Sequence, residues 1–108
     1  MTLKYGSENP ALRRAIQRIA RGRSENVRFV NPHAYDAMDD DGFDSEDVME
    51  CLQKGKVYGP EQYRSQLRCN VIHQGLEINV AVGGLDSVNG NWDSLERIAV
   101  VTVMRLKK

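Results

Sequence analysis

Apolar residues at helical spacing mark the first element of the chain. Between Pro10 and Gly22 they recur every three or four residues and form one stripe, made of Leu12, Ala15, Ile16, Ile19 and Ala20. A stripe of that period predicts an amphipathic helix. Asn9 can cap its first turn, proline suits the first helical position, and glycine commonly follows the last turn. We therefore expect the chain to open with a helix.

Two shorter helices are predicted next. Asn31-Pro32 repeats the combination of a capping residue and proline, and this signal opens a helix from about His33 to Asp39. A further helix is capped by Asp44 or Ser45 and has acidic residues in its first turn, where the helix dipole favours them. Because the connection between the two helices is short, we expect them to form an αα-hairpin.

The second half of the chain changes to a period of two, which is typical of strands with one buried face. The clearest case is the pair of alternating stretches on either side of Gln74-Gly75. A two-residue turn there would pair Val71 with Ile78 on the apolar face and Asn70 with Asn79 on the polar face. Both apolar faces then coincide, so this register is the one that burial selects.

The remaining strands complete the predicted fold. Residues Ile98 to Val103 are apolar on both faces, so this strand is expected to lie inside the sheet. Val27 to Val30 is interpreted as a short strand or an extended entry to the following helix. We therefore predict an α+β fold, with an N-terminal helix and an αα-hairpin packed on a three- to four-stranded, mainly antiparallel sheet. The 108 residues are expected to form a single domain.

Composition excludes several classes of protein. No apolar run approaches eighteen residues and the N-terminus has no apolar core segment, so we expect no membrane span and no secretory signal. Two cysteines, Cys51 and Cys69, are too few for a disulfide framework and are expected to be buried. The acidic residues between Asp39 and Asp47 do not match the spacing of ligands in a calcium-binding loop. We therefore expect a cytoplasmic protein without metal or cofactor.

Charge is strongly segregated although the net charge is zero. Residues 1–30 hold seven basic and two acidic side chains, residues 31–53 hold eight acidic and no basic ones, and the remainder is mildly basic. Such a bipolar distribution favours directional contacts with a partner. The arginine-rich helical segment 1–26 and the last strand supply candidate nucleic-acid-binding residues, namely Arg13, Arg14, Arg18, Arg21 and Arg105. The acidic segment supplies candidate partner-binding residues, namely Asp39, Asp40 and Asp41.

The polar face of the predicted sheet carries the candidate chemistry. Arg64, Arg68 and Asn70 alternate with apolar residues, and Glu77 and Asn79 occupy the same face of the next strand. Arginines on a rigid sheet can hold a phosphodiester through paired hydrogen bonds and stabilise the charge that develops on it. A nearby histidine or tyrosine could move the proton. The alternative interpretation is an exposed sheet face whose polar side chains only keep it soluble.

A family resemblance rests on short motifs spread over most of the chain. The run from His33-Ala34 to Met38, then Gly42-Phe43-Asp44-Ser45 and Gly55-Lys56-Val57, resembles the opening of a bacterial domain family of unknown function. That family is similar in architecture to the RelE-like and MqsR-like ribonuclease toxins of toxin–antitoxin systems, which use a sheet face without metal. The resemblance implies a RelE-like α+β core over 27–108. The residues that match family positions are His33, Arg64, Arg68 and Thr102, whereas Ala37 and Asp41 replace family arginines.

Three functional hypotheses follow. The first is a metal-independent ribonuclease of the toxin type, in which His33 or Tyr63 would handle protons while Arg64 and Arg68 hold the scissile phosphate. Its partners would be RNA and an antitoxin-like protein. The second is a non-catalytic module that binds a protein through the acidic helix hairpin. The third is simple nucleic-acid binding through the arginine-rich helix, without cleavage.

Overall fold

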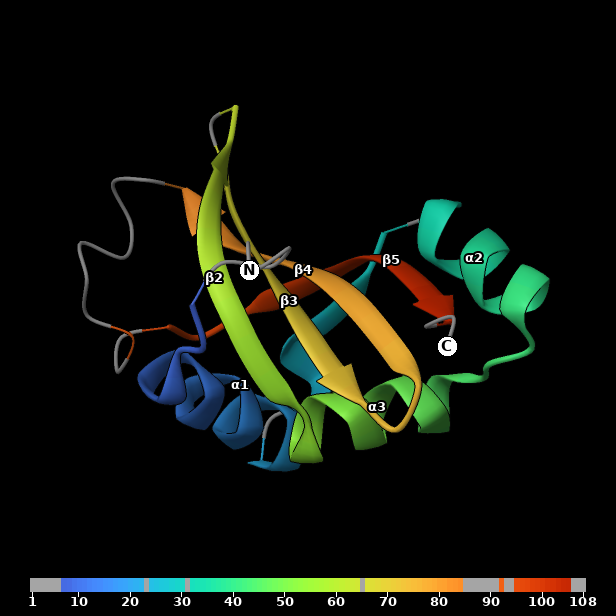
Figure 1. The fold of residues 1–108 in the computed structure, drawn as a ribbon, viewed down its shortest axis with the longest axis horizontal. Helices are drawn as coiled ribbons and strands as arrows, with labels where there is room; N and C mark the ends of the chain where they lie inside the picture. The colour runs from blue at the N-terminus through green and yellow to red at the C-terminus, as the bar shows by residue number, and fades with distance from the viewer. Residues whose placement is uncertain are drawn as a thin grey trace.

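The computed structural model describes residues 7–22, 24–30, 32–64, 66–84, 92 and 95–105, and Figure 1 shows their arrangement. The side chains of Ser24 and Tyr63 are outside this description. In chain order the elements are α1 (Pro10–Gly22), a 3₁₀ turn η1 (Ser24–Asn26), β1 (Val27–Phe29), α2 (His33–Asp41), α3 (Ser45–Lys54), β2 (Lys56–Tyr63), β3 (Gln66–His73), β4 (Leu76–Gly84) and β5 (Ile98–Arg105).

The described strands form one five-stranded sheet in the order β1-β5-β4-β3-β2. The α+β class is confirmed, but the sheet has more strands than predicted and is mixed, because β1 runs parallel to β5. Val27 lies beside Ile98, and the Val30 N–H extends the pairing by donating to the Val100 carbonyl at 2.9 Å. Three residues are too few to show an alternating pattern, so the sequence could not establish that β1 joins the sheet.

The hairpin of β3 and β4 has the predicted register. Val71 lies opposite Ile78, and Asn70 lies opposite Asn79. The turn residues Gln74 and Gly75 have φ values of 47° and 81°, so both adopt the left-handed conformation that a tight two-residue hairpin turn requires. The prediction that the last strand lies inside the sheet is also confirmed, because β5 is flanked by β1 and β4.

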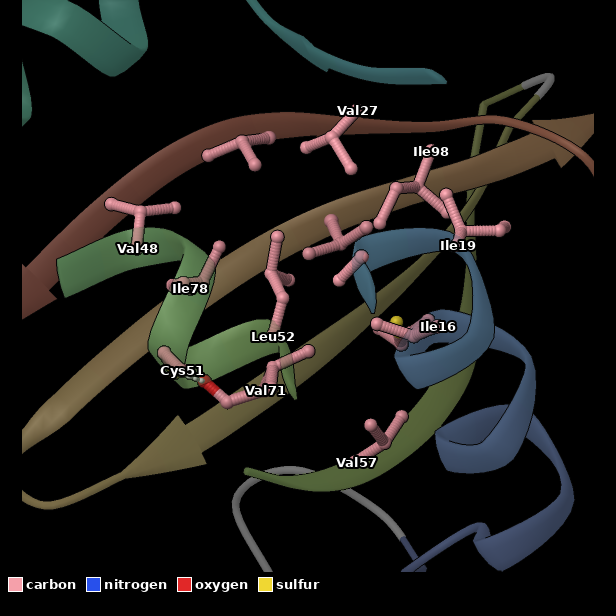
Figure 2. Close-up of a cluster of buried hydrophobic side chains, with 14 of the residues drawn as sticks. Ile16, Ile19, Val27, Val48, Cys51, Leu52, Val57, Val71, Ile78 and Ile98 are labelled. Carbon is pink, nitrogen blue, oxygen red and sulfur yellow. Dashed lines mark hydrogen bonds between the residues drawn. The ribbon is translucent and has the colours of Figure 1, made fainter. Parts of the chain in front are cut away.

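Helices α1 and α3 together cover one face of the sheet. Figure 2 shows Ile16 and Ile19 from α1 and Leu52 from α3 pointing toward the sheet, and they are buried in one hydrophobic cluster with strand residues such as Val71 and Ile98. Helix α2 does not form the predicted hairpin with α3. It packs beside β5 instead, as Figure 1 shows, while α3 packs against α1. Within the described ranges, no helix has the length and apolar character needed to cross a membrane.

The helix ends explain why these elements begin and stop where they do. The Asn9 side chain accepts a hydrogen bond from the Leu12 N–H at 3.0 Å, as its capping role predicts. Asp44 and Asp47 form a reciprocal capping box at the start of α3, with hydrogen bonds of 2.9 and 3.1 Å. Gly42 ends α2 in the left-handed conformation, at a φ of 75°.

Candidate functional site

One face of the sheet is left uncovered by α1 and α3, and we call it the open face. It carries the side chains that alternate with the buried core residues of β2 to β5. Because partners in register lie directly opposite each other, these side chains form rows that run across the strands. Three successive rows, which we call the tyrosine, arginine and glutamate rows, make up most of the open face.

The tyrosine row crosses four strands and is polar throughout. Tyr58, Asn70, Asn79 and Thr102 follow one another in register. The Asn79 Nδ2 donates to the Asn70 Oδ1 at 2.9 Å, while the Asn79 Oδ1 is buried and accepts no hydrogen bond from the described residues. A buried amide oxygen without a donor costs about 1–3 kcal/mol in a folded protein. An unsatisfied acceptor therefore lies near the centre of the open face.

The arginine row crosses all five strands. Its members in register are Glu61, Arg68, Ala81, Ala99 and Arg28. Neighbouring strands lie about 4.8 Å apart, so the Cα atoms of the two arginines are separated by about 14 Å. In register, Ala81 and Ala99 lie between them, and neither alanine belongs to the hydrophobic core cluster. The row therefore has a low centre with a guanidinium-bearing side chain on each side.

The glutamate row contains a buried acidic residue. Glu77 lies between Ile72 and Met104 in register and is only 7% exposed, whereas Met104 is 43% exposed. Among the described residues, Glu77 is the only charged residue that is buried. Its carboxylate therefore faces the open side of the sheet from a recessed position rather than from a freely solvated one.

Two hollows open on this face. The first hollow has a volume of about 280 Å³ and is lined by Tyr58, Glu61, Gln62, Arg68, Asn70, Glu77, Asn79, Thr102 and Met104. The second hollow has a volume of about 590 Å³ and is lined by Glu25, Asn26, Arg28, Gln66, Ala81, Gly83, Arg97, Ile98 and Ala99. The Arg68 guanidinium donates to the Gln66 Oε1 at 3.3 and 3.4 Å, so a hydrogen-bonded pair stands between the two hollows.

The predicted catalytic residues are only partly brought together. Arg68 lines the first hollow, but Arg64 and His33 line neither hollow. Arg64 is exposed in the turn after β2, at one edge of the sheet, and His33 is exposed at the start of α2, beyond the opposite edge. The side chain of Tyr63, the other predicted proton carrier, lies outside the described residues. Of the predicted set, the structure therefore assigns Arg68 to a hollow.

Most of the predicted nucleic-acid-binding arginines make hydrogen bonds within the fold. The guanidinium groups of Arg13 and Arg21 donate to the Lys54 and Gln53 carbonyls at 3.1 and 3.0 Å. These carbonyls are at the C-terminal end of α3, where the helix dipole makes positive charge favourable. The Arg18 guanidinium donates to the Leu95 carbonyl at 2.6 Å. Arg14 is exposed on the same helix, which lies on the covered side of the sheet. Binding of nucleic acid by α1 stays a prediction.

The acidic residues of α2 divide into two groups. Asp39 and Asp40 are exposed, whereas the Asp41 Oδ2 accepts a hydrogen bond from the Arg105 backbone N–H at 3.0 Å. The Arg105 guanidinium also donates to the Asp41 carbonyl at 2.6 Å and lies 4.7 Å from the centre of the Phe43 ring. Asp41 and Arg105 therefore fasten the end of α2 to β5. Asp39 and Asp40 are accessible to a partner.

The two thiols are buried away from the open face. Desolvation by burial raises the pKa of Cys51 and of Cys69 from 9.0 to about 12, with a further contribution from the Glu50 charge at Cys51. Both side chains are therefore protonated at neutral pH, and a thiolate nucleophile is not available. Among the residues that the structure describes, no three His, Cys, Asp or Glu side chains are grouped to hold a metal ion.

We compared the chain with known proteins. No family model, curated protein or solved structure matches it. The resemblance to the ribonuclease toxins therefore stays a prediction.

Among the residues that line the two hollows, sequence reasoning misses the recessed position of Glu77 and the contributions of Tyr58, Arg28 and Arg97. Alternation assigns Glu77 to the polar face and predicts that its side chain is exposed, whereas the residue is only 7% exposed in the structure. Tyr58 would have required the register of β2 on β3, which is interrupted between Tyr58 and Glu61. Arg28 and Arg97 could be found only by pairing β1 with β5. The signal for that pairing, three residues long, is too weak to use.

Proposed function

We propose that the protein binds single-stranded RNA on its open face and cleaves it without a metal ion. The observation that carries this proposal is the composition of the first hollow. Three neighbouring strands contribute a phenol from Tyr58, a guanidinium from Arg68 and a recessed carboxylate from Glu77. A metal-independent ribonuclease needs a group that stabilises charge on the phosphate, a base and an acid, and these three residue types supply all of them.

Each residue has a defined role in the proposed reaction. The Glu77 carboxylate takes the proton of the ribose 2′-hydroxyl as the 2′-oxygen forms its bond to phosphorus. The bond from phosphorus to the 5′-oxygen breaks, and the Tyr58 hydroxyl gives its proton to that leaving oxygen. The Arg68 guanidinium stabilises the negative charge on the non-bridging oxygens. The products are a 2′,3′-cyclic phosphate and a 5′-hydroxyl, and proton exchange with water restores Glu77 and Tyr58.

This assignment keeps one predicted residue and replaces others. Arg68 retains the phosphate-holding role that the sequence indicated. Glu77 and Tyr58 take the proton-transfer roles for which the sequence suggested His33 or Tyr63, because Glu77 and Tyr58 line the same hollow as Arg68. The resemblance to RelE-like toxins supports a place in a toxin–antitoxin system. In that setting an antitoxin-like protein would inhibit the enzyme by covering the open face.

The test is cleavage of several RNAs by the purified chain in the presence of a metal chelator. General acid and base groups typically contribute 10²–10⁴-fold to the rate, so Glu77→Gln is expected to lower the rate by about 100-fold or more. Arg68→Ala should have an effect of similar size. Lys54→Ala removes an exposed positive charge on α3 and serves as the matched control, with unchanged cleavage expected.

Three results would count against the proposal. The first is the absence of cleavage with every RNA tested, the second is cleavage that the chelator abolishes, and the third is full activity in the folded Glu77→Gln variant. End-group analysis of the products gives a further check, because a 3′-phosphate made directly by water would exclude attack by the 2′-oxygen. His33→Ala tests the prediction from the sequence in the same assay.

A second candidate function is binding of a basic protein partner by α2, and one observation favours it. Tyr35 is 47% exposed although its ring stacks on Phe29 at a centroid distance of 5.9 Å. Asp39 follows Tyr35 by one helical turn and Asp40 lies beside it, so an accessible aromatic ring is bordered by carboxylates. Interface cores are enriched in tyrosine, and charged rims direct association.

This second candidate is tested with a fluorescent peptide rich in lysine and arginine. We expect salt-sensitive binding that the Asp39→Asn and Asp40→Asn double variant abolishes. The matched control is Glu46→Gln, which neutralises an exposed acid on α3. Equal loss of binding in the control and the double variant would indicate a general effect of charge and exclude a specific α2 surface.

A further inference from the structure

We infer that the second hollow is a nucleotide-binding subsite, and that it holds the phosphate and base of the nucleotide one step beyond the two that flank the scissile bond. This inference rests on the proposed function, because it assigns the neighbouring nucleotide to a place beside the first hollow. Its ligand is single-stranded RNA longer than a dinucleotide. The two hollows then have different tasks, with chemistry in the first and most of the charge-based affinity in the second.

The distribution of charge between the hollows supports this division. The first hollow contains Arg68 together with two carboxylates, Glu61 and Glu77. The second contains Arg28 and Arg97 with one carboxylate, Glu25. Affinity for nucleic acid depends mainly on cationic contacts with phosphates. An RNA strand is therefore held poorly by the charges of the first hollow alone, and the excess of positive charge needed to hold it is in the second.

The shape of the second hollow fits a nucleotide. Its floor contains Ala81 and Ala99, whose small side chains leave the sheet surface low at the centre of the arginine row. Asn26 and Gln66 line it as well, and amide groups offer both donors and acceptors to the edge of a base. Guanidinium groups at the side of such a floor can bind a phosphate through paired hydrogen bonds. The hollow thus combines contacts for the phosphate with contacts for the base.

The two hollows are also continuous along the arginine row. Arg68 lines the first hollow, and its hydrogen-bonded partner Gln66 lines the second. Arg68 and Arg28 stand in the same row, about 14 Å apart at their Cα atoms. A strand that places one phosphate at Arg68 can therefore extend over the alanine floor and place the next phosphate toward Arg28 and Arg97.

Binding of RNA analogues that cannot be cleaved tests the subsite apart from the chemistry. Oligonucleotides with 2′-O-methyl riboses lack the attacking hydroxyl, and fluorescence anisotropy reports their affinity as a dinucleotide and as a tetranucleotide. The double variant Arg28→Ala with Arg97→Ala should weaken tetranucleotide binding at least about tenfold, as expected for loss of charged hydrogen bonds. Dinucleotide binding should change less than about twofold. Lys54→Ala is the control for loss of charge and should bind both as the wild type does.

Salt dependence gives a second readout that a merely structural effect would not move. The slope of log affinity against log salt concentration changes by about 0.7 for each phosphate contact on a single strand. The double variant should therefore lower the slope by about 1.4 for the tetranucleotide. For the dinucleotide the slope should stay as in the wild type.

A variant of the floor provides an independent test without changing charge. Ala99 faces the open side and is not part of the core cluster, so Ala99→Leu should fill the hollow while the protein stays folded. We expect this variant to lose the gain in affinity from dinucleotide to tetranucleotide. Ala99→Ser keeps the floor low and should retain that gain.

The outcomes separate the subsite from the proposed function. Tetranucleotide binding that depends on Arg28 and Arg97, in a protein that cleaves no RNA, would support the subsite and refute the catalytic proposal. Cleavage and tetranucleotide binding that are both unchanged in the folded double variant and in Ala99→Leu would refute the subsite and leave the catalytic proposal intact. Equal losses for dinucleotide and tetranucleotide would also refute it, because a neighbouring subsite contacts only the longer ligand.

Discussion

Gly55 lies at the junction of α3 and β2, and replacing it with alanine is expected to destabilise the protein. The backbone conformation is not the cause, since φ is −75° and ψ is 160°, values that any residue adopts. The cause is space. A Cβ atom on Gly55 would lie 2.6 Å from the Cys51 carbonyl oxygen, 2.8 Å from the Val71 Cγ1 and 2.9 Å from the Ile72 carbonyl oxygen.

The size of the effect follows from which atoms would have to move. Two of the three close atoms are backbone carbonyl oxygens, which cannot turn away as a side chain can. The Gly55 N–H donates to the Cys51 carbonyl at 2.7 Å, and the next residue, Lys56, is in register with Ile72. Relief would therefore disturb both the last turn of α3 and the start of β2. Overpacking of this kind costs about 1–3 kcal/mol, a large part of a typical stability of about 5–15 kcal/mol.

The assay is thermal and urea unfolding of Gly55→Ala beside Gly22→Ala. Each kcal/mol should lower Tm by about 4–8 °C for a domain of this size. The control, Gly22, is the last residue of α1 and a Cβ there meets no atom within 4 Å. It should be neutral or stabilising by up to about 1 kcal/mol. Equal stability of the two variants would refute the reasoning. Because β2 carries Tyr58, Gly55→Ala should also slow RNA cleavage.

Other perturbations test separate parts of the structure. Cys51 and Cys69 should not react with a thiol reagent until the protein unfolds. Burial raises the pKa of each thiol from 9.0 to about 12, so above about pH 9 the thiols ionise in the unfolded state before they do in the folded state, and the stability of the fold should decrease. Replacing either thiol with alanine should reduce that decrease. Asp44→Ala removes the capping box of α3 and should cost about 1 kcal/mol in urea unfolding; an unchanged midpoint would contradict this. Arg105→Ala should speed hydrogen exchange in α2 more than in α3, and equal effects on both helices would contradict its role in fastening α2.

The parts of the fold that the sequence predicts well are those with repeated local signals. The register of β3 and β4 follows from alternation on both sides of Gln74-Gly75, because any slip by one residue would expose the apolar face. The caps of α1 and α3 follow from single residues, Asn9 and Asp44, whose side chains reach the neighbouring backbone N–H groups. These features need no knowledge of distant parts of the chain.

The arrangement of the helices depends on contacts that no local pattern contains. Helix α2 buries only Ala34 and Met38, and two apolar residues do not indicate whether the helix packs on α3 or on β5. Likewise, the sequence shows the charge of Arg13 and Arg21 but not that the C-terminal end of α3 lies within their reach. Tertiary packing decided these points.

The candidate site was predictable as a face but not as a set of residues. Arg68 and the paired asparagines could be placed on one polar face by alternation within a single hairpin. The recess that holds Glu77, and the side of the second hollow formed by Arg28 and Arg97, require strand neighbours that are remote in sequence. The resemblance to ribonuclease toxins implies an active site on a sheet face, and the proposed function retains that location. It also matches His33 to a family position, but His33 lines neither hollow.

The parallel pairing of β1 with β5 has a consequence for how the protein is made. As the chain leaves the ribosome, Val27 to Phe29 emerge well before their partner strand, so this edge of the sheet cannot close until Ile98 to Arg105 have also emerged. Contacts between such remote segments slow folding. The meander of β2 to β4 can form first, whereas β1 and α2 must wait for β5. A nascent chain stalled before Ile98 would therefore expose the apolar surface that β5 later covers, and would be the form most in need of a chaperone.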